Sequence, residues 1–493
     1  GPSATSEYEL FPDALERLEP YILAAMKRVP AFGEVGIKRV YNGAIAYTPD
    51  GSPIVGPAWG LKNFWLNEGH SFGVTAAGGA GWQLAHWIVD GEPTIDMMGV
   101  DPRRFGPYAT RGYLKEKNEE AYANVFTLHF PDEERSAARP LKTTPAYERQ
   151  KQLGAVFGSV YGWERANWFA KPCDDTSEET TQTWNRAGPW EARIREECEA
   201  VRDACGVLDL PGFSRFWLQG EGADNWLRGF CTGGIPKVGR MNLIYISDTR
   251  GRIVTELSCI RLGEDNFVLI TAASAQWHDG ELIRKSVPEG VNVRETTTER
   301  DTLVVTGPTS RAVLAGISDA DLEQGWLTHQ WATVAGQKAF LIRVSFAGEL
   351  GWEIHAENAV MPAIYDAVLA AGAKPFGMYA LNSLRIEKGY RAWKGDLSTD
   401  YTLLEGGLER FVKLDKSQDF TGKAAILSEK QSGRKKAFAT LVIDAGTCDA
   451  PYMSTLWQGD TLVGETTSGA WGYRVNASVA LAMLRPDLTE PGT

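Results

Sequence analysis

The chain has 493 residues, of which 43% are hydrophobic and 11% aromatic, and it carries a formal net charge of −12. A chain of this length and apolar content builds two or three globular domains, so a disordered or fibrous protein is excluded. The acidic balance excludes a nucleic-acid-binding protein, because a phosphate backbone is met by clustered Lys and Arg.

Cysteine, histidine and hydropathy patterns exclude further classes. The six cysteines form no C-x-x-C pair and the six histidines no H-E-x-x-H spacing, so we expect neither a disulfide framework nor a metal site. No run of about 18 apolar residues is present, so no membrane span is expected. We therefore expect a cytoplasmic protein, or one of the mitochondrial matrix if the source is eukaryotic.

The first hundred residues predict a helix, a strand and a glycine-rich turn. Apolar residues at helical spacing predict a helix over residues 8–29, and residues 37–47 have the composition of a strand. A turn at residues 69–73 then leads into an apolar helix. Its free N–H groups and the positive helix end suit a bound cofactor, and tight helix packing is the structural alternative.

This segment resembles part of a flavin domain. The stretches TPDGSPIVGP (residues 48–57) and EGHSFG (residues 68–73) are similar to the C-terminal portion of the FAD domain in the D-amino-acid-oxidase-like superfamily. The resemblance implies that this turn lies against the flavin, through Gly69, His70, Ser71, Phe72 and Gly73. That superfamily holds the FAD pyrophosphate with a G-x-G-x-x-G motif, which this chain lacks near its start. We therefore expect FAD to bind only if a missing N-terminal part is supplied.

The rest of the chain predicts a connector and two further domains. Residues 99–157 show little periodicity and are interpreted as a connector that wraps a neighbour. Strands then follow helices or other strands across tight turns, which predicts an α+β domain with antiparallel sheet. Residues 435–443 open a smaller, strand-rich unit. The predicted domains are therefore 1–98, 99–157, 158–434 and 435–493.

One strand places an acid where it can bind a ring with adjacent N–H groups. An apolar strand over residues 339–344 meets a turn at Gly348 and resumes at Trp352, so alternation puts Glu353 on the face opposite Trp352 and Ile354. A carboxylate fixed there can accept two parallel N–H bonds, the geometry that a pterin ring presents. A solvent-facing Glu on an edge strand is the alternative.

Six motifs in order resemble the aminomethyltransferase family, the T-protein of glycine cleavage. They are GVLDL (206–210), GRIVTEL (251–257), SFAGELGWE (345–353), SLRIEKGY (383–390), EGGLERFVK (405–413) and FTGK (420–423). Combined with the flavin-like segment in front, they resemble the dimethylglycine and sarcosine dehydrogenases. The resemblance implies a partial FAD domain, a folate-binding domain and a small β-barrel-like C-terminal domain.

The resemblance also implies site residues. The pterin-binding glutamate falls on Glu353, and Phe346 occupies the position of a Tyr, which keeps stacking and loses the hydroxyl. The catalytic acid beside the folate nitrogens falls on Glu256, where most relatives have Asp. Arg385 is placed near the folate and Trp393 in its pocket wall. Two alternatives remain open: Glu256 as an acid at the edge of a sheet, and Arg385 as a partner of Glu387 or Asp396.

The implied activity is the oxidative N-demethylation of a small methylated amine of the dimethylglycine or sarcosine type. The one-carbon unit passes to tetrahydrofolate and gives 5,10-methylenetetrahydrofolate. A carboxylate near the iminium stabilises its charge and can take the proton that a folate nitrogen releases. Two alternatives are a flavin-independent aminomethyl- or methyltransferase, and a non-catalytic folate-binding subunit that completes a flavin domain on another polypeptide. The expected protein partner is a flavin-domain segment or an electron acceptor protein.

Overall fold

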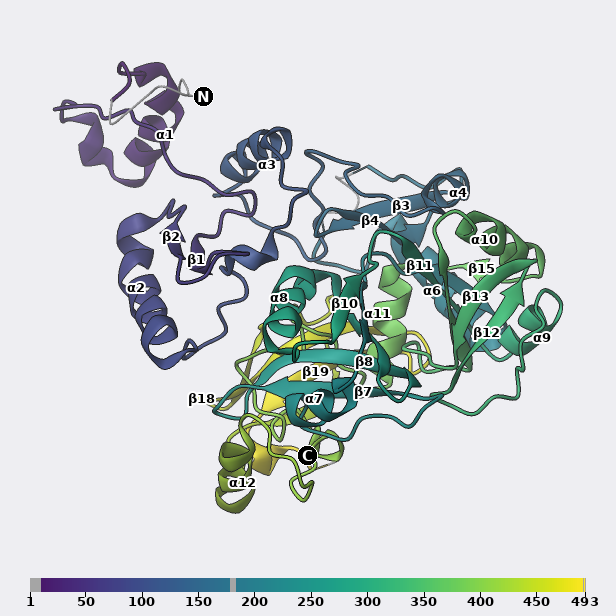
Figure 1. Ribbon diagram of the computed structural model, residues 1–493. Coiled ribbons are helices and arrows are strands. Elements are labelled where there is room, and N and C mark those ends of the chain that lie inside the picture. The colour runs from purple at the N-terminus through teal and green to yellow at the C-terminus, as the bar shows by residue number, and fades with distance from the viewer. Residues whose placement is uncertain (1–9, 178–182, 491, 493) are drawn as a thin grey trace.

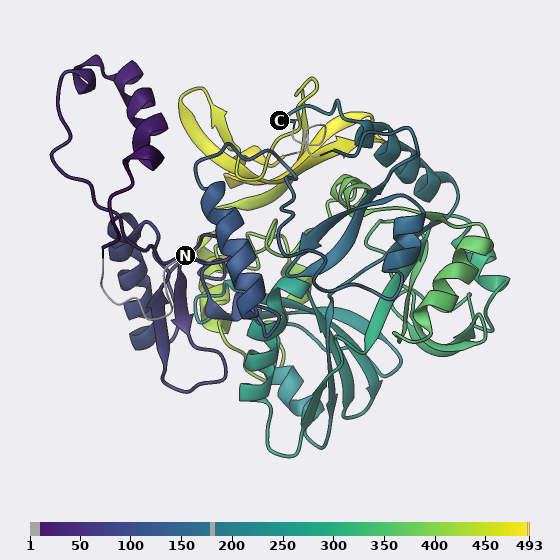
Figure 2. The same cartoon turned by 90° about the horizontal axis from the view of Figure 1, so that it is seen from above.

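The computed structural model describes residues 10–177, 183–490 and 492 of the chain. Two regions stand out in Figures 1 and 2. The N-terminal helix lies away from the rest of the molecule, whereas the teal, green and yellow parts of the chain form one body. The fold is α+β with mainly antiparallel sheets, as predicted.

The N-terminal region is built from isolated elements. Helix α1 (Leu15–Arg28) lies within the predicted helix, whose residues 8 and 9 fall outside the described part of the chain, and it buries none of its side chains. The strand predicted over residues 37–47 is wrong. This segment is irregular, and Ile37, Tyr41 and Ile45 are exposed, because no described strand pairs with it beyond a single bridge at Gly43.

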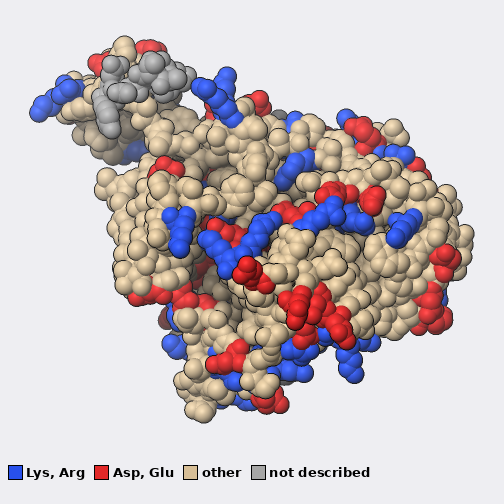
Figure 3. Space-filling model, in the orientation of Figure 1, with Lys and Arg blue, Asp and Glu red and all other residues tan. Residues whose placement is uncertain are grey.

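A hairpin and a long helix follow. Strands β1 (Ile54–Pro57) and β2 (Trp65–Glu68) pair antiparallel, and the predicted apolar helix is α2 (Gly73–Asp90), which begins where the glycine-rich turn ends. Around α2 the surface shown in Figure 3 is mostly uncharged, whereas both signs of charge mix over the rest of that face.

The connector is more regular than its sequence indicated. It contains η2 (Pro102–Arg104), α3 (Arg111–Ala123) and α4 (Tyr147–Gln152). The hydroxyl of Thr110 caps α3 by accepting from the backbone N–H of Tyr113, a signal that the sequence carries. The connector is fixed to the neighbouring domain through Arg103, whose guanidinium bonds both Asp101 and Glu281.

Two sheets form the folate-type domain. The six-stranded sheet has the order β12-β13-β14-β11-β5-β15, with β12 (His329–Val334), β13 (Gln337–Ile342), β14 (Gly351–Glu357), β11 (Arg300–Thr306), β5 (Gly206–Asp209) and β15 (Lys374–Pro375). The five-stranded sheet has the order β10-β6-β9-β8-β7, with β10 (Asn292–Glu295), β6 (Ser214–Gln219), β9 (Asn266–Thr271), β8 (Ile253–Gly263) and β7 (Met241–Ser247).

Helices cover these sheets. They are α6 (Pro189–Asp203), α7 (Ala223–Phe230), α8 (Gln276–Ser286), α9 (Ser310–Ala315), α10 (Met361–Ala370) and α11 (Met378–Glu387). The hairpin β3 (Ala155–Val160) and β4 (Trp163–Phe169) lies beside α11 and α6. The remaining short 3₁₀ helices are η1 (Pro30–Gly33), η3 (Ala273–Ala275), η4 (Glu409–Phe411) and η5 (Pro486–Leu488).

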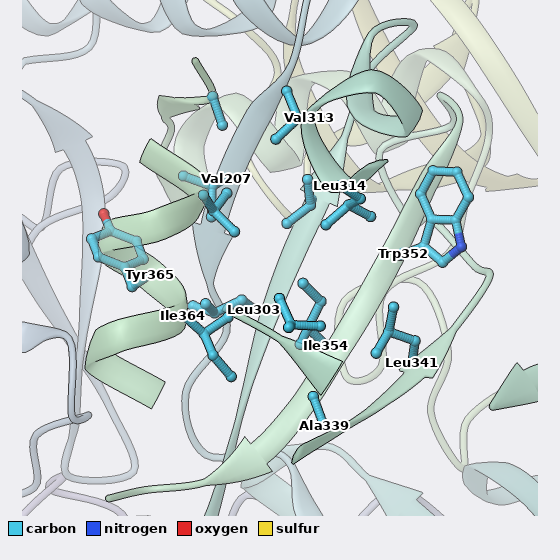
Figure 4. Close-up of a cluster of buried hydrophobic side chains, with 14 of the residues drawn as sticks. Val207, Leu303, Val313, Leu314, Ala339, Leu341, Trp352, Ile354, Ile364 and Tyr365 are labelled. Atoms are coloured by element: carbon cyan, nitrogen blue, oxygen red, sulfur yellow. The ribbon is translucent and has the colours of Figure 1, made fainter. Parts of the chain in front are cut away.

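The largest core lies between the six-stranded sheet and helices α9 and α10, on the face of the sheet opposite to Glu353. In Figure 4, Trp352 and Ile354 of β14 lie with Leu303 of β11 and with Ile364 and Tyr365 of α10. All five are essentially inaccessible to solvent. Burying large apolar side chains on this face stabilises the domain and fixes the register of β14, so the residues between them point the other way.

The C-terminal unit is a four-stranded sheet with the order β16-β19-β18-β17. Its elements are α12 (Lys423–Ser432), β16 (Ala437–Ile443), β17 (Thr455–Gln458), β18 (Thr461–Gly472) and β19 (Ala477–Leu484). Met483 of β19 joins a buried cluster with Tyr245 of β7 and Leu397, so this sheet shares a core with the folate-type domain.

Within the described residues, no helix combines the length and apolar character needed to cross a bilayer. In the same part of the chain, no group of three or more His, Cys, Asp or Glu side chains could hold a metal ion.

Candidate functional site

Glu353 lies in the middle of the six-stranded sheet. Strand β14 is paired on both sides, with Glu353 opposite Ile342 of β13 and Val304 of β11. The alternative of a Glu on an edge strand is therefore wrong. The side chain keeps 23% of its surface exposed, which leaves an acid in a buried sheet face with access to a ligand.

Glu256 lies on an inner strand of the five-stranded sheet. It lies on β8 between β9 and β7, directly opposite Tyr245, whose hydroxyl donates to the carboxylate. The edge-strand alternative is wrong here too. Burial raises the pKa of Glu256, while the bond from Tyr245 and the charge of Arg391 act in the opposite direction.

Both acids face the space between the two sheets. Ile342, the cross-strand neighbour of Glu353, belongs to a buried cluster that also contains Ile260 of β8. Ile260 has the same parity along β8 as Glu256, so the two point to the same face. The elements therefore bring the two predicted acids, about a hundred residues apart in sequence, onto facing surfaces.

Phe346 lies on the turn between β13 and β14. Its ring is stacked on Tyr390 with a centroid separation of 6.0 Å and an interplanar angle of 19°. Beside this pair is a hollow of about 210 Å³ lined by Trp326, Arg343, Val344, Ser345, Gly348, Glu349, Leu350, Gly351 and Tyr390. Gly351 begins the strand that carries Glu353, so this hollow opens at the end of the sheet where that acid lies.

Arg385 is buried and engaged within the protein. It forms an ion pair with Asp396 at 2.5 Å and also donates to Asn382, Ser468 and the carbonyl of Tyr390. Asp396 is one of the two partners that the sequence left open, although the pair is internal rather than exposed. Because all of its nitrogens already donate to protein atoms, Arg385 is a weak candidate for a folate contact.

Trp393 lies near the second acid. It packs in the cluster that contains Tyr245, the partner of Glu256. Its indole Nε1 is buried and has no hydrogen-bond partner among the described residues. A buried N–H without an acceptor is costly, so this group is open to an acceptor on a ligand.

The flavin-like turn is sparsely partnered. Nε2 of His70 lies 2.7 Å from Oδ1 of Asn67, whereas its buried Nδ1 has no partner among the described residues. Phe72 is exposed and its ring meets Phe126 edge-on. Along α2, a Cβ added at Gly78, Gly79 or Gly81 would meet no described atom within 4 Å, so tight packing within the described chain does not explain these glycines.

Four residues around the acids were not predicted. Tyr245 and Arg391 surround Glu256, while His355 and Arg215 lie near Glu353. His355 was accessible from the sequence, because it shares a strand face with Glu353 two residues earlier. Tyr245 was accessible as well, because it lies directly across the β7–β8 hairpin from Glu256. Arg391 and Arg215 come from distant segments, and only the fold brings them to the acids.

Comparison with known proteins assigns most of the chain. The model of the GCVT N-terminal domain matches residues 146–416, more than half of the chain. A glycine cleavage T-protein C-terminal barrel domain matches 436–493, a FAD dependent oxidoreductase central domain 90–144 and a FAD dependent oxidoreductase 1–87. The domain limits predicted above stay a prediction.

Two relatives align with nearly the whole chain. Mitochondrial dimethylglycine dehydrogenase of Rattus norvegicus is 34% identical over 98% of this chain and 57% of its own length. Mitochondrial sarcosine dehydrogenase of Mus musculus is 31% identical over 94% and 56%. The chain therefore spans somewhat more than half of these relatives, and the predicted resemblance is confirmed.

A solved structure supports the fold. The aminomethyltransferase T of the glycine cleavage system from Bartonella henselae superposes with a TM-score of 0.61 and 24% identity, covering 72% of this chain and 92% of that one. The fold class predicted for the second half of the chain is confirmed.

Proposed function

Because the chain belongs to the family of the GCVT N-terminal domain, we propose that it binds a reduced folate between its two sheets, with Glu353 as the ligand of the pterin ring. The observation that carries the proposal is the placement of Glu353 and Glu256 on facing sheet surfaces around one cluster. A carboxylate on a rigid strand can receive two parallel N–H donors at little cost in entropy.

The residues present fit a folate. Glu353 supplies the acceptor, Phe346 and Tyr390 supply a stacked aromatic edge, and Trp393 supplies a buried donor without a partner. Folate, when bound, supplies the nitrogens that carry a one-carbon unit. Glu256 is suited to take up a proton there, because burial raises its pKa and the Tyr245 hydroxyl holds the carboxylate in place.

We assign this site to oxidative N-demethylation of a small methylated amine, of the dimethylglycine or sarcosine type. The product is then 5,10-methylenetetrahydrofolate. This assignment is supported by the order of the four matched domains and by the two dehydrogenase relatives. FAD is the expected second cofactor, and Gly69, His70, Ser71, Phe72 and Gly73 are proposed to lie against it. We assign no step of amine oxidation to this chain.

Folate binding tests the first part. We expect Glu353→Gln to weaken the binding of 5-formyltetrahydrofolate about 10- to 100-fold in isothermal titration calorimetry, because a charged acceptor is lost. The matched control is Glu357→Gln on the same strand, whose carboxylate is exposed and paired with Arg300. Equal affinity of the Glu353 variant and the wild type would contradict the proposed pterin site.

Two further measurements separate the alternatives. Titration with FAD, followed by flavin fluorescence, is expected to show no tight binding to the chain alone, and stoichiometric binding contradicts this. One-carbon transfer from a methylated donor to tetrahydrofolate without an electron acceptor would instead favour a flavin-independent transferase. Folate binding without any transfer, in the presence of a flavoprotein partner and an electron acceptor, would favour a non-catalytic subunit.

A further inference from the structure

We propose that His355 is a positioning residue that holds Glu353 through its Nε2–H tautomer, an inference that rests on the proposed role of Glu353 in pterin binding. His355 lies two residues after Glu353 on the same face of β14 and is almost fully buried. Its Nε2 is 3.0 Å from Oε2 of Glu353 and its Nδ1 is 2.9 Å from the hydroxyl of Thr302.

The partners on both sides of the ring select the tautomer. The carboxylate of Glu353 can only accept, so Nε2 of His355 donates to it. Arg215 donates through Nη2 to the hydroxyl oxygen of Thr302. A guanidinium can only donate, so the hydroxyl accepts from Arg215 and is free to give its own proton to Nδ1 of His355. A neutral imidazole that accepts at Nδ1 carries its proton at Nε2, where it donates to Glu353.

The surroundings keep the ring neutral. Burial is the largest influence on the pKa of His355 and lowers it, Glu353 acts to raise it, and Arg215 and Arg300 act to lower it. Phe340 of the neighbouring strand is cross-strand to the ring and adds no charge. Above the ordinary histidine pKa of about 6.5, His355 is therefore a neutral donor.

The consequence for Glu353 is a fixed carboxylate plane. A bond to Oε2 from a ring locked in a sheet removes rotamer freedom from the acid and leaves Oε1 and the remaining lone pairs for a ligand. Arg215, which donates to Thr302 in this series of hydrogen bonds, is buried as well. A site pre-organised in this way loses less entropy when the ligand binds.

Calorimetric titration of the full chain with 5-formyltetrahydrofolate tests the inference. We expect His355→Leu to weaken binding about tenfold, and His355→Gln to recover most of the loss, because its amide reaches the position of Nε2 and donates there. Thr302→Val is expected to weaken binding less than His355→Leu, and Thr302→Ser to restore it. His278→Gln on α8 is the control histidine, and its affinity is expected to equal that of the wild type.

Nitrogen NMR of histidine-labelled protein gives a readout that a general packing defect does not produce. We expect the resonance lost in His355→Gln to be that of an Nε2–H tautomer, and an Nδ1–H tautomer would overturn the inference. Wild-type affinity in His355→Leu overturns it as well, provided that Glu353→Gln binds weakly. Wild-type affinity in Glu353→Gln rejects the proposed function itself. Should His355→Leu fail to fold, the glutamine variant and the NMR assignment decide.

Discussion

Helices α2 and α11 are both apolar, but the structure treats them in opposite ways. Helix α11 buries six of its ten residues, whereas α2 buries one of eighteen. Val74 of α2 is fully exposed, and a Cβ added at Gly78, Gly79 or Gly81 would meet no described atom within 4 Å. An apolar helix is stabilised by packing against a neighbouring element. Its own composition does not show whether the surrounding chain supplies that element.

The largest difference in stability between the two regions is expected for two tryptophan substitutions, one in each region. Trp352→Ala is expected to lower the free energy of unfolding of the folate-type domain by about 3–5 kcal/mol, because it opens a cavity in the largest core. Trp82→Ala in α2, where 63% of the residue is exposed, is expected to change it by less than about 0.5 kcal/mol. Urea unfolding followed by circular dichroism measures both, and equal losses would contradict the difference between the regions.

Charged side chains give the second test. Arg385→Met is expected to destabilise the protein by about 3 kcal/mol, because it leaves Asp396 buried without its cation. Arg17→Met in the exposed helix α1 is the control, with an expected change below about 0.5 kcal/mol. Similar midpoints of urea unfolding for the two variants would show that the buried pair is dispensable.

A smaller effect is expected in the pH dependence of the free energy of unfolding. Burial and the neighbouring Asp301 raise the pKa of Asp209 well above its ordinary value, so the folded state retains a proton that the unfolded state releases above about pH 3.9. The free energy of unfolding is therefore expected to fall as pH rises from there through the folded pKa. Asp209→Asn mimics the protonated acid, since its amide can donate to Asp301 and accept from Thr144 and Gln150.

The Asn variant is therefore expected to lose this slope and to be more stable than the wild type at the alkaline end. Glu16→Gln in α1 serves as the control and is expected to leave the profile unchanged. Urea unfolding at a series of pH values measures the slope. A slope that persists in the Asn variant would assign the proton to another group.

The smallest expected effect on stability is in α2. Val74→Ser combined with Val89→Ser is expected to leave the unfolding free energy within about 0.5 kcal/mol, because both side chains are at least 81% exposed. Light scattering at high concentration is expected to fall, since the change removes apolar surface. Lower stability with unchanged association would mean that these valines are covered within the chain.

Most of the folate-type fold could be predicted from its sequence. Alternation in β14 identified the outward face of Trp352 and the inward face of Glu353, because one buried face fixes the register. The same reasoning failed for residues 37–47, whose apolar residues lack a described partner strand. It also missed α3, whose cap at Thr110 was a readable signal.

The candidate site was only partly predictable. The two acids and Phe346 came from motifs, but whether the strands that carry them are central or at an edge depends on pairing across long distances. The hydrogen bond from Arg215 to Thr302 also joins distant segments, whereas the bond from Tyr245 to Glu256 spans only the local β7–β8 hairpin. For Arg385 the motif suggested a ligand contact, but its guanidinium donates within the protein, for example to Ser468 of β18.

Helix α11 is hydrogen-bonded to two other elements, at its start and near its middle. At its start the N–H of Gly377 donates to Glu197 of α6 at 2.8 Å, and further along Ser383 donates to the carbonyl of Trp471 in β18 at 2.6 Å. The helix therefore links α6 to the C-terminal sheet through two hydrogen bonds. We therefore expect local opening to cost more in this helix than in the loops around it.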